Sequence, residues 1–318
     1  IMSAKTSHYK IVLFGVKTDT YDLYCKFKDD IDLVVTLNSN EMDNYKISGG
    51  KNINTLIKPD TECFGSNSYN FSTDECKDFF NNNTFDIGIV YGWQRLIPQY
   101  VLDKFKHGIF GFHASPLGLP FGKGRSPINW SIILNFKQVY NQCFKYNKNP
   151  DDGLIYSTTK LDILPWDNIS SVRLKSIIDA EKTISNLIID YKLNTIKDKL
   201  QEQDKNLPES FFPKRKSYDG KVDLLNNTSI EFFNLVRGVS HPFPGAFLYY
   251  NDEKVIIWEA YPFSYTLYKE EKYKVGEILK IFNDNSFLIK TIDGVLLVKD
   301  WICPTWGKSK LVVGNCFK

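Results

Sequence analysis

The feature that most constrains the fold of this chain is a set of four short apolar runs within the first 112 positions. Runs of this kind, closed by glycine or by polar residues, are typical of parallel strands buried on both faces. Residues 74–81 and 98–106, which lie between runs, have helical character. Strands alternating with helices predict an α/β fold, here a Rossmann-like, mainly parallel sheet with helices on both faces. The four runs are Ile11–Gly15, Asp32–Leu37, Asp86–Gly92 and Gly108–Phe112.

The pattern changes along the rest of the chain. The polar stretch 38–69 has no clear period, and we expect long loops there. Residues 166–200 carry apolar positions at helical spacing and predict one long helix, and Ser229–Val239 predicts another. From Val255 onward, four short β runs are separated by turn signals such as Asp293-Gly294, which predicts a small, barrel-like β-rich domain.

These patterns divide the 318 residues into three parts. We expect an N-terminal α/β domain over 1–205, a linker loop and helix over 206–250, and a small C-terminal β domain over 251–318. With 42% hydrophobic residues, a chain of this length can bury a large core.

Composition narrows the class of protein further. The formal charge of +3 gives no overall basic field, so a nucleic-acid partner is not expected. No apolar run approaches the roughly 20 residues that span a bilayer, and Ile1–Lys5 lacks the apolar stretch of a signal peptide. The six cysteines form no CxxC pair and the four histidines are scattered, so we expect free thiols and no metal site. We therefore expect a soluble, cytoplasmic protein with no membrane partner.

One histidine stands out among the polar residues near the predicted strand ends. His113 follows the fourth run and precedes a loop rich in glycine and proline. Histidine titrates near neutrality, so it can exchange a proton with a substrate, and Asp151 or Asp152 could supply the carboxylate that orients it. Trp93-Gln94 also follows a strand, and the carboxyl ends of parallel strands share one edge, so both segments are expected to face one cleft.

The motif around His113 resembles a known family. The residues His113-Ala114-Ser115, Leu119-Pro120, Gly124-Arg125 and Pro127, followed by Asp151-Asp152-Gly153, resemble the 10-formyltetrahydrofolate-dependent formyltransferases. Phe212–Asp223 is similar to the loop before the C-terminal region of that family, and Val236–Phe247 to its helix and Pro-Gly-Ala element. The resemblance runs from about Lys10 to Asp300, with the elements in the family's order.

The resemblance implies a formyltransferase catalytic domain over 1–205. In family terms His113 is the general base and acid, and Asp151 orients it directly or through a water. The cofactor is 10-formyltetrahydrofolate, and its pterin lies against the segment after the third strand. Leu96 and Ile97 could equally be core residues, and Trp93 could simply pack on a helix. The implied cofactor-binding residues are Trp93, Gln94, Leu96, Ile97 and Asp152.

One position departs from the family. The formyltransferases usually carry asparagine two residues before the histidine, where its amide donates to the developing oxyanion, and this chain has Gly111 there. Removing one such donor costs roughly 10²–10³-fold in rate. Gln94 and Asn129 are the candidate replacements, and a backbone amide of the glycine-rich loop is the alternative.

The implied acceptor is the amine of a nucleotide-linked amino sugar, such as a dTDP- or UDP-linked 3- or 4-amino dideoxy sugar. The loop Phe212–Gly220 resembles the sugar-nucleotide N-formyltransferases, whose basic and aromatic residues suit a pyrophosphate and a base. The implied substrate-binding residues are Arg125, Arg215, Lys216 and Tyr218. Arg125 could instead tie down its own loop.

Two other readings stay open. A methionyl-tRNA formyltransferase must hold a polyanion, and residues 269–280 are mixed in charge rather than strongly basic. A folate- or nucleotide-binding relative without activity would explain Gly111, although His113 and Asp151 are both retained. A homodimer through the C-terminal β region is a further possibility.

Overall fold

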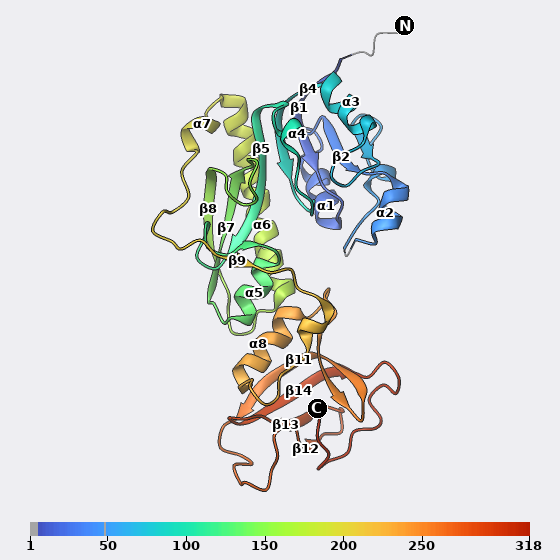
Figure 1. Cartoon of the computed structure of the whole chain (residues 1–318), viewed down its shortest axis with the longest axis vertical. Helices are drawn as coiled ribbons and strands as arrows, with labels where there is room; N and C mark the ends of the chain where they lie inside the picture. The colour runs from blue at the N-terminus through green and yellow to red at the C-terminus, as the bar shows by residue number, and fades with distance from the viewer. Residues whose placement is uncertain (1–5, 48) are drawn as a thin grey trace. The chain divides into compact units, whose positions relative to one another are not determined.

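The computed structural model describes residues 6–47 and 49–318 (Figure 1). The stretch Ile1–Lys5, which bears on the expectation of no signal peptide, lies outside the described residues. Contacts divide the chain into two compact units whose segments interleave in sequence. Unit 1 comprises residues up to 124 together with 140–160 and 175–211, and unit 2 comprises 125–139, 161–174 and 212–318.

The centre of unit 1 is a seven-stranded sheet in the order β3-β2-β1-β4-β5-β7-β8. The first five strands in this order pair in parallel, and β7 pairs antiparallel to β5. The predicted mainly parallel α/β sheet is confirmed. Its strands are β1 (His8–Phe14), β2 (Leu33–Leu37), β3 (Glu62–Ser66), β4 (Thr84–Val90), β5 (Phe105–Ser115), β7 (Gln138–Lys145) and β8 (Ile155–Asp162).

Helices cover both faces of this sheet because successive side chains of a strand point to opposite faces. In β1, Ile11 and Leu13 join one core with the helices α1 (Thr18–Phe27) and α6 (Ile169–Leu193). Val12 and Phe14 join a second core on the other face. That face is covered by α2 (Ser39–Tyr45), α3 (Asp74–Asn82) and α4 (Gln99–Leu102).

Three expectations need correction. Residues 38–69 are not all loop, because they contain α2, a short 3-10 helix (Ile53–Thr55) and the edge strand β3. The helix α2 begins after Asn38, whose side chain caps it by accepting a hydrogen bond from the Glu41 amide. The helix expected over 98–106 is the single turn α4, because β5 already begins at Phe105. The helix expected over 166–200 is α6 followed by the short α7 (Ile196–Lys199).

Unit 2 contains a five-stranded antiparallel sheet in the order β10-β11-β14-β13-β12. The helix α8 (Ser229–Val239) packs on β11 and beside α5 (Pro127–Ile133). Phe232 and Val236 of α8 enter the same core as Trp301. The predicted C-terminal β region is confirmed. Its strands are β10 (Ala246–Tyr250), β11 (Glu253–Ser264), β12 (Ile278–Ile281), β13 (Phe287–Lys290) and β14 (Val295–Ile302).

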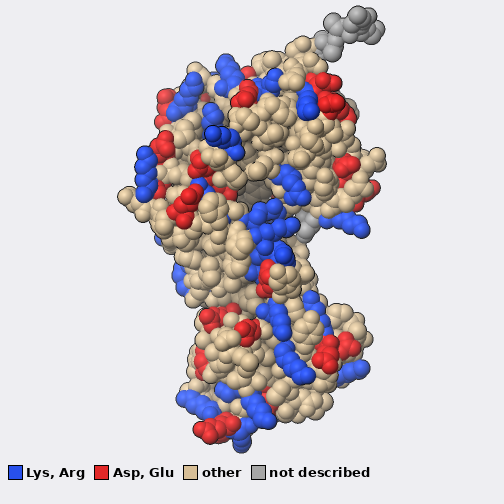
Figure 2. Space-filling model, in the orientation of Figure 1, with Lys and Arg blue, Asp and Glu red and all other residues tan. Residues whose placement is uncertain are grey.

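Two short strands, β6 (Lys123–Gly124) and β9 (Phe211–Phe212), form a small ladder, and residues Ser217–Gly220 form a 3-10 turn. Apart from one gathering of Lys and Arg near the middle, the face drawn in Figure 2 mixes basic with acidic side chains. In the described part of the chain no helix is long and apolar enough to cross a bilayer.

Candidate active site

His113 lies on β5, in the part of that strand that extends past its neighbour β4. The last pair between β4 and β5 joins Ile89 to Phe110, whereas β5 continues to Ser115 and stays paired with β7. The sequence placed His113 after a strand, and it lies instead within the overhanging end of one. This end is at the carboxyl edge of the parallel strands, where α/β sheets bind ligands.

The His113 ring is buried between a carbonyl and a carboxylate. Its Nε2 lies 2.7 Å from the carbonyl oxygen of Gly122, and its Nδ1 lies 3.6 Å from Oδ1 of Asp151. Because a carbonyl only accepts, Nε2 carries a hydrogen and donates it to Gly122. The 3.6 Å separation is too long for a hydrogen bond but suits an ion pair or a bridging water.

The local backbone fixes Asp151 opposite His113. Oδ2 of Asp151 accepts from the Gly124 amide at 2.8 Å, so its other oxygen is left to face the histidine. The side-chain amide of Gln203 donates to the carbonyls of Asp151 and Gly153, which ties down the turn. A Cβ at Gly153 would lie 1.6 Å from the Lys145 carbonyl oxygen. Only glycine lets the turn approach β7 this closely, which explains why glycine follows the two aspartates.

Asp152 contacts a buried lysine rather than the histidine. Nζ of Lys123 lies 2.9 Å from Asp152 and 2.7 Å from Glu209, and the side chain is almost fully buried. Burial opposes the charge, but hydrogen bonds to Glu209 and Asp152 keep the pKa of Lys123 above its ordinary value. Hydrogen bonds from Lys123 and then from Asn149 lower the pKa of the Asp152 carboxyl. This cluster anchors the loop that carries Gly122.

The segment expected to hold the pterin follows β4. Trp93 and Ile97 are buried in the core, and Trp93 stacks on Phe71 at 4.9 Å. Leu96, between them, is 64% exposed. The Trp93 indole Nε1–H is buried and has no partner among the described residues. The segment therefore offers an exposed apolar side chain and an unused donor, and its role in cofactor binding stays a prediction.

The two side-chain amides named as oxyanion donors have different settings. Nδ2 of Asn129 donates to the Gly238 carbonyl at 2.8 Å, so this amide links α5 to α8. Gln94 is half-buried, and its backbone amide donates to the Tyr69 hydroxyl. As oxyanion donors, both Asn129 and Gln94 stay predictions.

The predicted substrate-binding residues lie in unit 2. The Arg215 guanidinium sits 5.0 Å from the centre of the Trp130 ring and donates to the Asp219 carbonyl. Trp130 also stacks with Phe212 and donates to the Pro213 carbonyl. Lys216 lies over the Tyr218 ring, and Tyr218 is 65% exposed. These residues form an aromatic and basic surface, which we call the Trp130 platform.

Two residues near the site, Lys123 and Ser115, were not anticipated from the sequence. The backbone amide of Arg125 donates to the Phe212 carbonyl, and the role of the Arg125 side chain stays a prediction. No local pattern marks Lys123 in the sequence, because its acidic partners Asp152 and Glu209 are distant along the chain. Ser115, on the same face of β5 as His113, has a buried hydroxyl without a partner among the described residues. Only the known alternation of a strand could have placed Ser115 beside His113.

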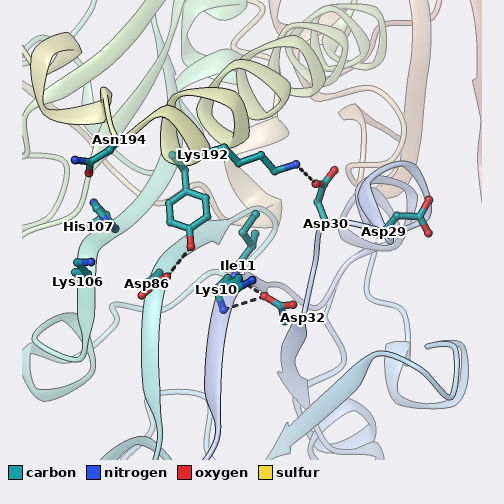
Figure 3. A pocket seen from close by; sticks show the side chains of 11 residues that line it. Lys10, Ile11, Asp29, Asp30, Asp32, Asp86, Lys106, His107, Lys192 and Asn194 are labelled. Atoms are coloured by element: carbon teal, nitrogen blue, oxygen red, sulfur yellow. Dashed lines mark hydrogen bonds and ion pairs between the residues drawn. The ribbon is translucent and has the colours of Figure 1, made fainter.

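A cavity of about 620 Å³ lies at the opposite, amino-terminal ends of the strands (Figure 3). Charges of both signs line it. Lys192 pairs with Asp30, and Asp86 accepts a hydrogen bond from the Tyr191 hydroxyl. Burial would raise the pKa of Asp86, but hydrogen bonds from Tyr191 and His8 lower it. None of the predicted site residues lines this cavity.

Residues 6–47 and 49–318 hold no group of three metal-ligating side chains, and all six cysteines are free.

Comparison with known proteins gives a family match in the C-terminal part of the chain. The family described as "Formyl transferase, C-terminal domain" matches residues 214–304. Among curated proteins, the chain is 31% identical over 184 residues to the bifunctional polymyxin resistance protein ArnA of Wigglesworthia glossinidia brevipalpis, covering 58% of this chain and 27% of that protein. It is 30% identical over 223 residues to a methionyl-tRNA formyltransferase of Buchnera aphidicola subsp. Schizaphis graminum, covering 69% and 66% respectively.

Solved structures share the fold at lower identity. HypX from Aquifex aeolicus superposes with a TM-score of 0.63 at 16% identity, covering 94% of this chain and 45% of HypX. The N-formyltransferase from Helicobacter canadensis, solved with folinic acid and dTDP-3-aminofucose, gives a TM-score of 0.60 at 18% identity, with 91% and 97% covered.

The α/β unit and the antiparallel C-terminal sheet together form the fold of the formyltransferases. This chain belongs to the formyltransferase family. It spans between about a quarter and two thirds of the length of the curated relatives that it matches.

Proposed function

We propose that this protein transfers a formyl group from 10-formyltetrahydrofolate to the amine of a nucleotide-linked amino sugar. The observation that carries the proposal is the approach of His113 to Asp151 at the carboxyl edge of the sheet. These two residues are 38 positions apart in sequence (151 − 113), and the fold brings them to 3.6 Å. We expect release of tetrahydrofolate when the protein is mixed with the formyl donor and an amino-sugar nucleotide. No turnover with any amine acceptor would contradict the proposal.

In this reaction, His113 and Asp151 would have different roles. The bound donor supplies an electrophilic formyl carbon. His113 accepts the proton that the attacking amine loses, and Asp151 stabilises the resulting imidazolium. Nε2 becomes available as the acceptor of this proton only when the Gly122 carbonyl turns away and the ring hydrogen is on Nδ1, which faces Asp151. The loss of that hydrogen bond costs about 0.5–1.5 kcal/mol, which the bound ligands can offset.

The residues after β4 fit a folate. A pterin has an apolar face and a hydrogen-bonding edge. Leu96 offers an exposed apolar side chain for the face, and the unpartnered Trp93 indole N–H is a donor suited to the edge. Folate-binding relatives support the assignment, since an Aquifex HypX structure contains tetrahydrofolic acid.

This cofactor assignment predicts the behaviour of a Leu96→Asn variant. Covering an exposed leucine with a ligand ring contributes about 1.4 kcal/mol, which corresponds to a tenfold change in affinity. We therefore expect the Kd for folinic acid to rise about tenfold, measured by isothermal titration calorimetry. Leu225→Asn, at a leucine of unit 2 that is exposed even more than Leu96, is the control and should leave the Kd unchanged. Equal Kd values for both variants and the parent would refute the assignment of Leu96.

The Trp130 platform supports a nucleotide as part of the acceptor. Arg215 and Lys216 can meet a pyrophosphate, and the exposed Tyr218 ring can meet a base. The H. canadensis relative was solved with dTDP-3-aminofucose, and a second neighbour is described as a sugar 3N-formyl transferase in the presence of dTDP. The sugar and the base that this chain prefers are tested with a panel of nucleotides.

For Arg215→Ala we expect a raised KM for the amino-sugar nucleotide. A charged hydrogen bond to phosphate is worth about 1.5–3 kcal/mol, so the rise should be about 10- to 100-fold. The kcat should change less than about threefold, because the pyrophosphate is distant from the reacting amine. Lys308→Ala removes an exposed cation paired with Asp300 and is the control. A KM that stays at the parental value would contradict a nucleotide site on the Trp130 platform.

A methionyl-tRNA acceptor is the second candidate, and the Buchnera relative carries that name. Binding of a polyanion weakens steeply with salt, whereas binding of a nucleotide with two phosphates weakens little. Formylation of initiator methionyl-tRNA, with a steep salt dependence and no turnover of any amino-sugar nucleotide, would favour this candidate. Tight folate binding with no turnover at all would favour a non-catalytic relative.

A further inference from the structure

Gly111 takes the position of the family asparagine, and a tyrosine occupies the space that a side chain would need there. A Cβ placed on Gly111 would lie 2.2 Å from the Tyr146 hydroxyl oxygen and 2.4 Å from two of its ring carbons. Real Cβ atoms do not approach other atoms this closely. Gly111 is therefore required by Tyr146, whose hydroxyl lies where an asparagine side chain would begin.

The pairing of β5 with β7 puts this hydroxyl on the same face as His113. Gly111 pairs with Phe144 and His113 with Gln142, and the Tyr146 amide donates to the Ile109 carbonyl. Side chains at alternate positions share a face, so Tyr146 and His113 project to the same side of the sheet. Gly111 and His113 are two residues apart, which is about 7 Å along a strand.

We propose that the Tyr146 hydroxyl donates a hydrogen bond to the formyl oxygen during transfer and replaces the missing amide. The proposal rests on the proposed function. Among the described residues, no group forms a hydrogen bond with this hydroxyl, so it is open to a ligand. The Ser115 hydroxyl lies on the other side of His113, away from the position of the family asparagine.

The electrostatic surroundings keep Tyr146 in the form that can donate. Burial raises the pKa of the phenol, and the negative charge of Asp151 raises it further. The phenol therefore keeps its proton at neutral pH and above.

The bond changes define what the hydroxyl would stabilise. The acceptor nitrogen forms a bond to the formyl carbon, and the carbonyl π pair moves onto oxygen, where Tyr146 donates its hydrogen bond. When this pair returns, the bond between the carbon and the donor nitrogen breaks. His113 takes the proton from the acceptor nitrogen and delivers it to the departing nitrogen. Tyr146 keeps its own proton throughout.

Tyr146→Phe removes the hydroxyl and keeps the ring over Gly111. We expect kcat to fall about 10²–10³-fold, the usual effect of losing one oxyanion donor, with the thermal midpoint within a few degrees of the parent. Tyr156→Phe is the matched control. Its hydroxyl donates to Asp190 in the core on the opposite face, so kcat should not change. A Tyr146→Phe enzyme with parental kcat would overturn the proposal.

A swap of the two positions tests the geometry itself. Gly111→Asn alone should disrupt the site, because the new side chain collides with the Tyr146 ring. Tyr146→Ala frees that space, so the double variant Gly111→Asn with Tyr146→Ala can place an amide there. We expect this double variant to regain at least tenfold in kcat over Tyr146→Ala. A double variant no faster than Tyr146→Ala would contradict a shared role for the two positions.

A binding measurement separates this proposal from the proposed function. With 3-fluorotyrosine at position 146, the fluorine resonance should shift when 10-formyl-5,8-dideazafolate is added without an acceptor. Under the same conditions, 3-fluorotyrosine at position 156 should show no shift. A bound analogue that leaves the resonance of position 146 unmoved would overturn the role of Tyr146, even if the protein turns over an amino-sugar nucleotide. A shift without turnover would support Tyr146 and count against the proposed acceptor.

Discussion

Substitution of His113 by glutamine lowers kcat about 10²–10⁴-fold, because the proton of the attacking amine loses its acceptor. Glutamine keeps a donor that can reach the Gly122 carbonyl, so the loop that Gly122 belongs to should stay in place. The KM for the formyl donor should change little, since the segment after β4 is untouched. Steady-state kinetics with each substrate varied in turn measures both quantities.

The control for this variant is another histidine of the same unit. His107 lies at the amino-terminal end of β5, where it lines the cavity distant from His113. His107→Gln should leave kcat at the parental value. If His113→Gln retained more than a tenth of the parental kcat, proton transfer by this ring would not be the basis of the reaction.

Substitution of Asp151 by asparagine has a comparably large expected effect. In enzymes with a Ser-His-Asp triad, an amide in place of the aspartate costs about 10⁴-fold, because it neither holds the correct tautomer nor stabilises the imidazolium. The contact here is 3.6 Å rather than a direct hydrogen bond, so we expect a smaller loss of about 10²–10³-fold. The asparagine oxygen can still accept from the Gly124 amide, which keeps the turn folded.

The same substitution at the neighbouring Asp152 provides a comparison for Asp151→Asn. Asp152 faces Lys123 instead of His113. We therefore expect Asp152→Asn to act mainly by lowering the thermal stability of the protein, with a smaller effect on kcat. The pH profile distinguishes the two roles. Asp151→Asn should displace the limb of the kcat profile that reports His113, whereas Asp152→Asn should leave this limb in place. Identical pH profiles for Asp151→Asn and the parent would show that Asp151 does not act through the histidine.

Much of the fold could be predicted because the strands are short and apolar throughout. The runs at Ile11–Gly15 and Asp86–Gly92 became β1 and β4, since burial on both faces leaves no polar position to confuse the pattern. The edge strand β3 was missed for the opposite reason. Glu62 and Cys63 are exposed, so this strand has no apolar run to mark it.

The site was partly predictable for a different reason. His113 and Asp151 were marked by the family motif, and the structure brings them together. The tyrosine at position 146 carried no such mark, because its relation to Gly111 depends on how β7 pairs with β5. Lys123 was likewise missed, because its partner Glu209 is 86 residues away in sequence. Contacts that depend on strand register or on distant loops leave no local pattern in a sequence.

The most direct test of the central claim is formyl transfer measured with purified protein, 10-formyltetrahydrofolate and a panel of dTDP- and UDP-linked amino sugars. The formylated product is identified by mass spectrometry. We expect at least one amino-sugar nucleotide to gain a single formyl group with the parent enzyme, and expect the His113→Gln variant to be slower by at least a hundredfold. Formylation at equal rates by both proteins, or of methionyl-tRNA alone, would contradict the account.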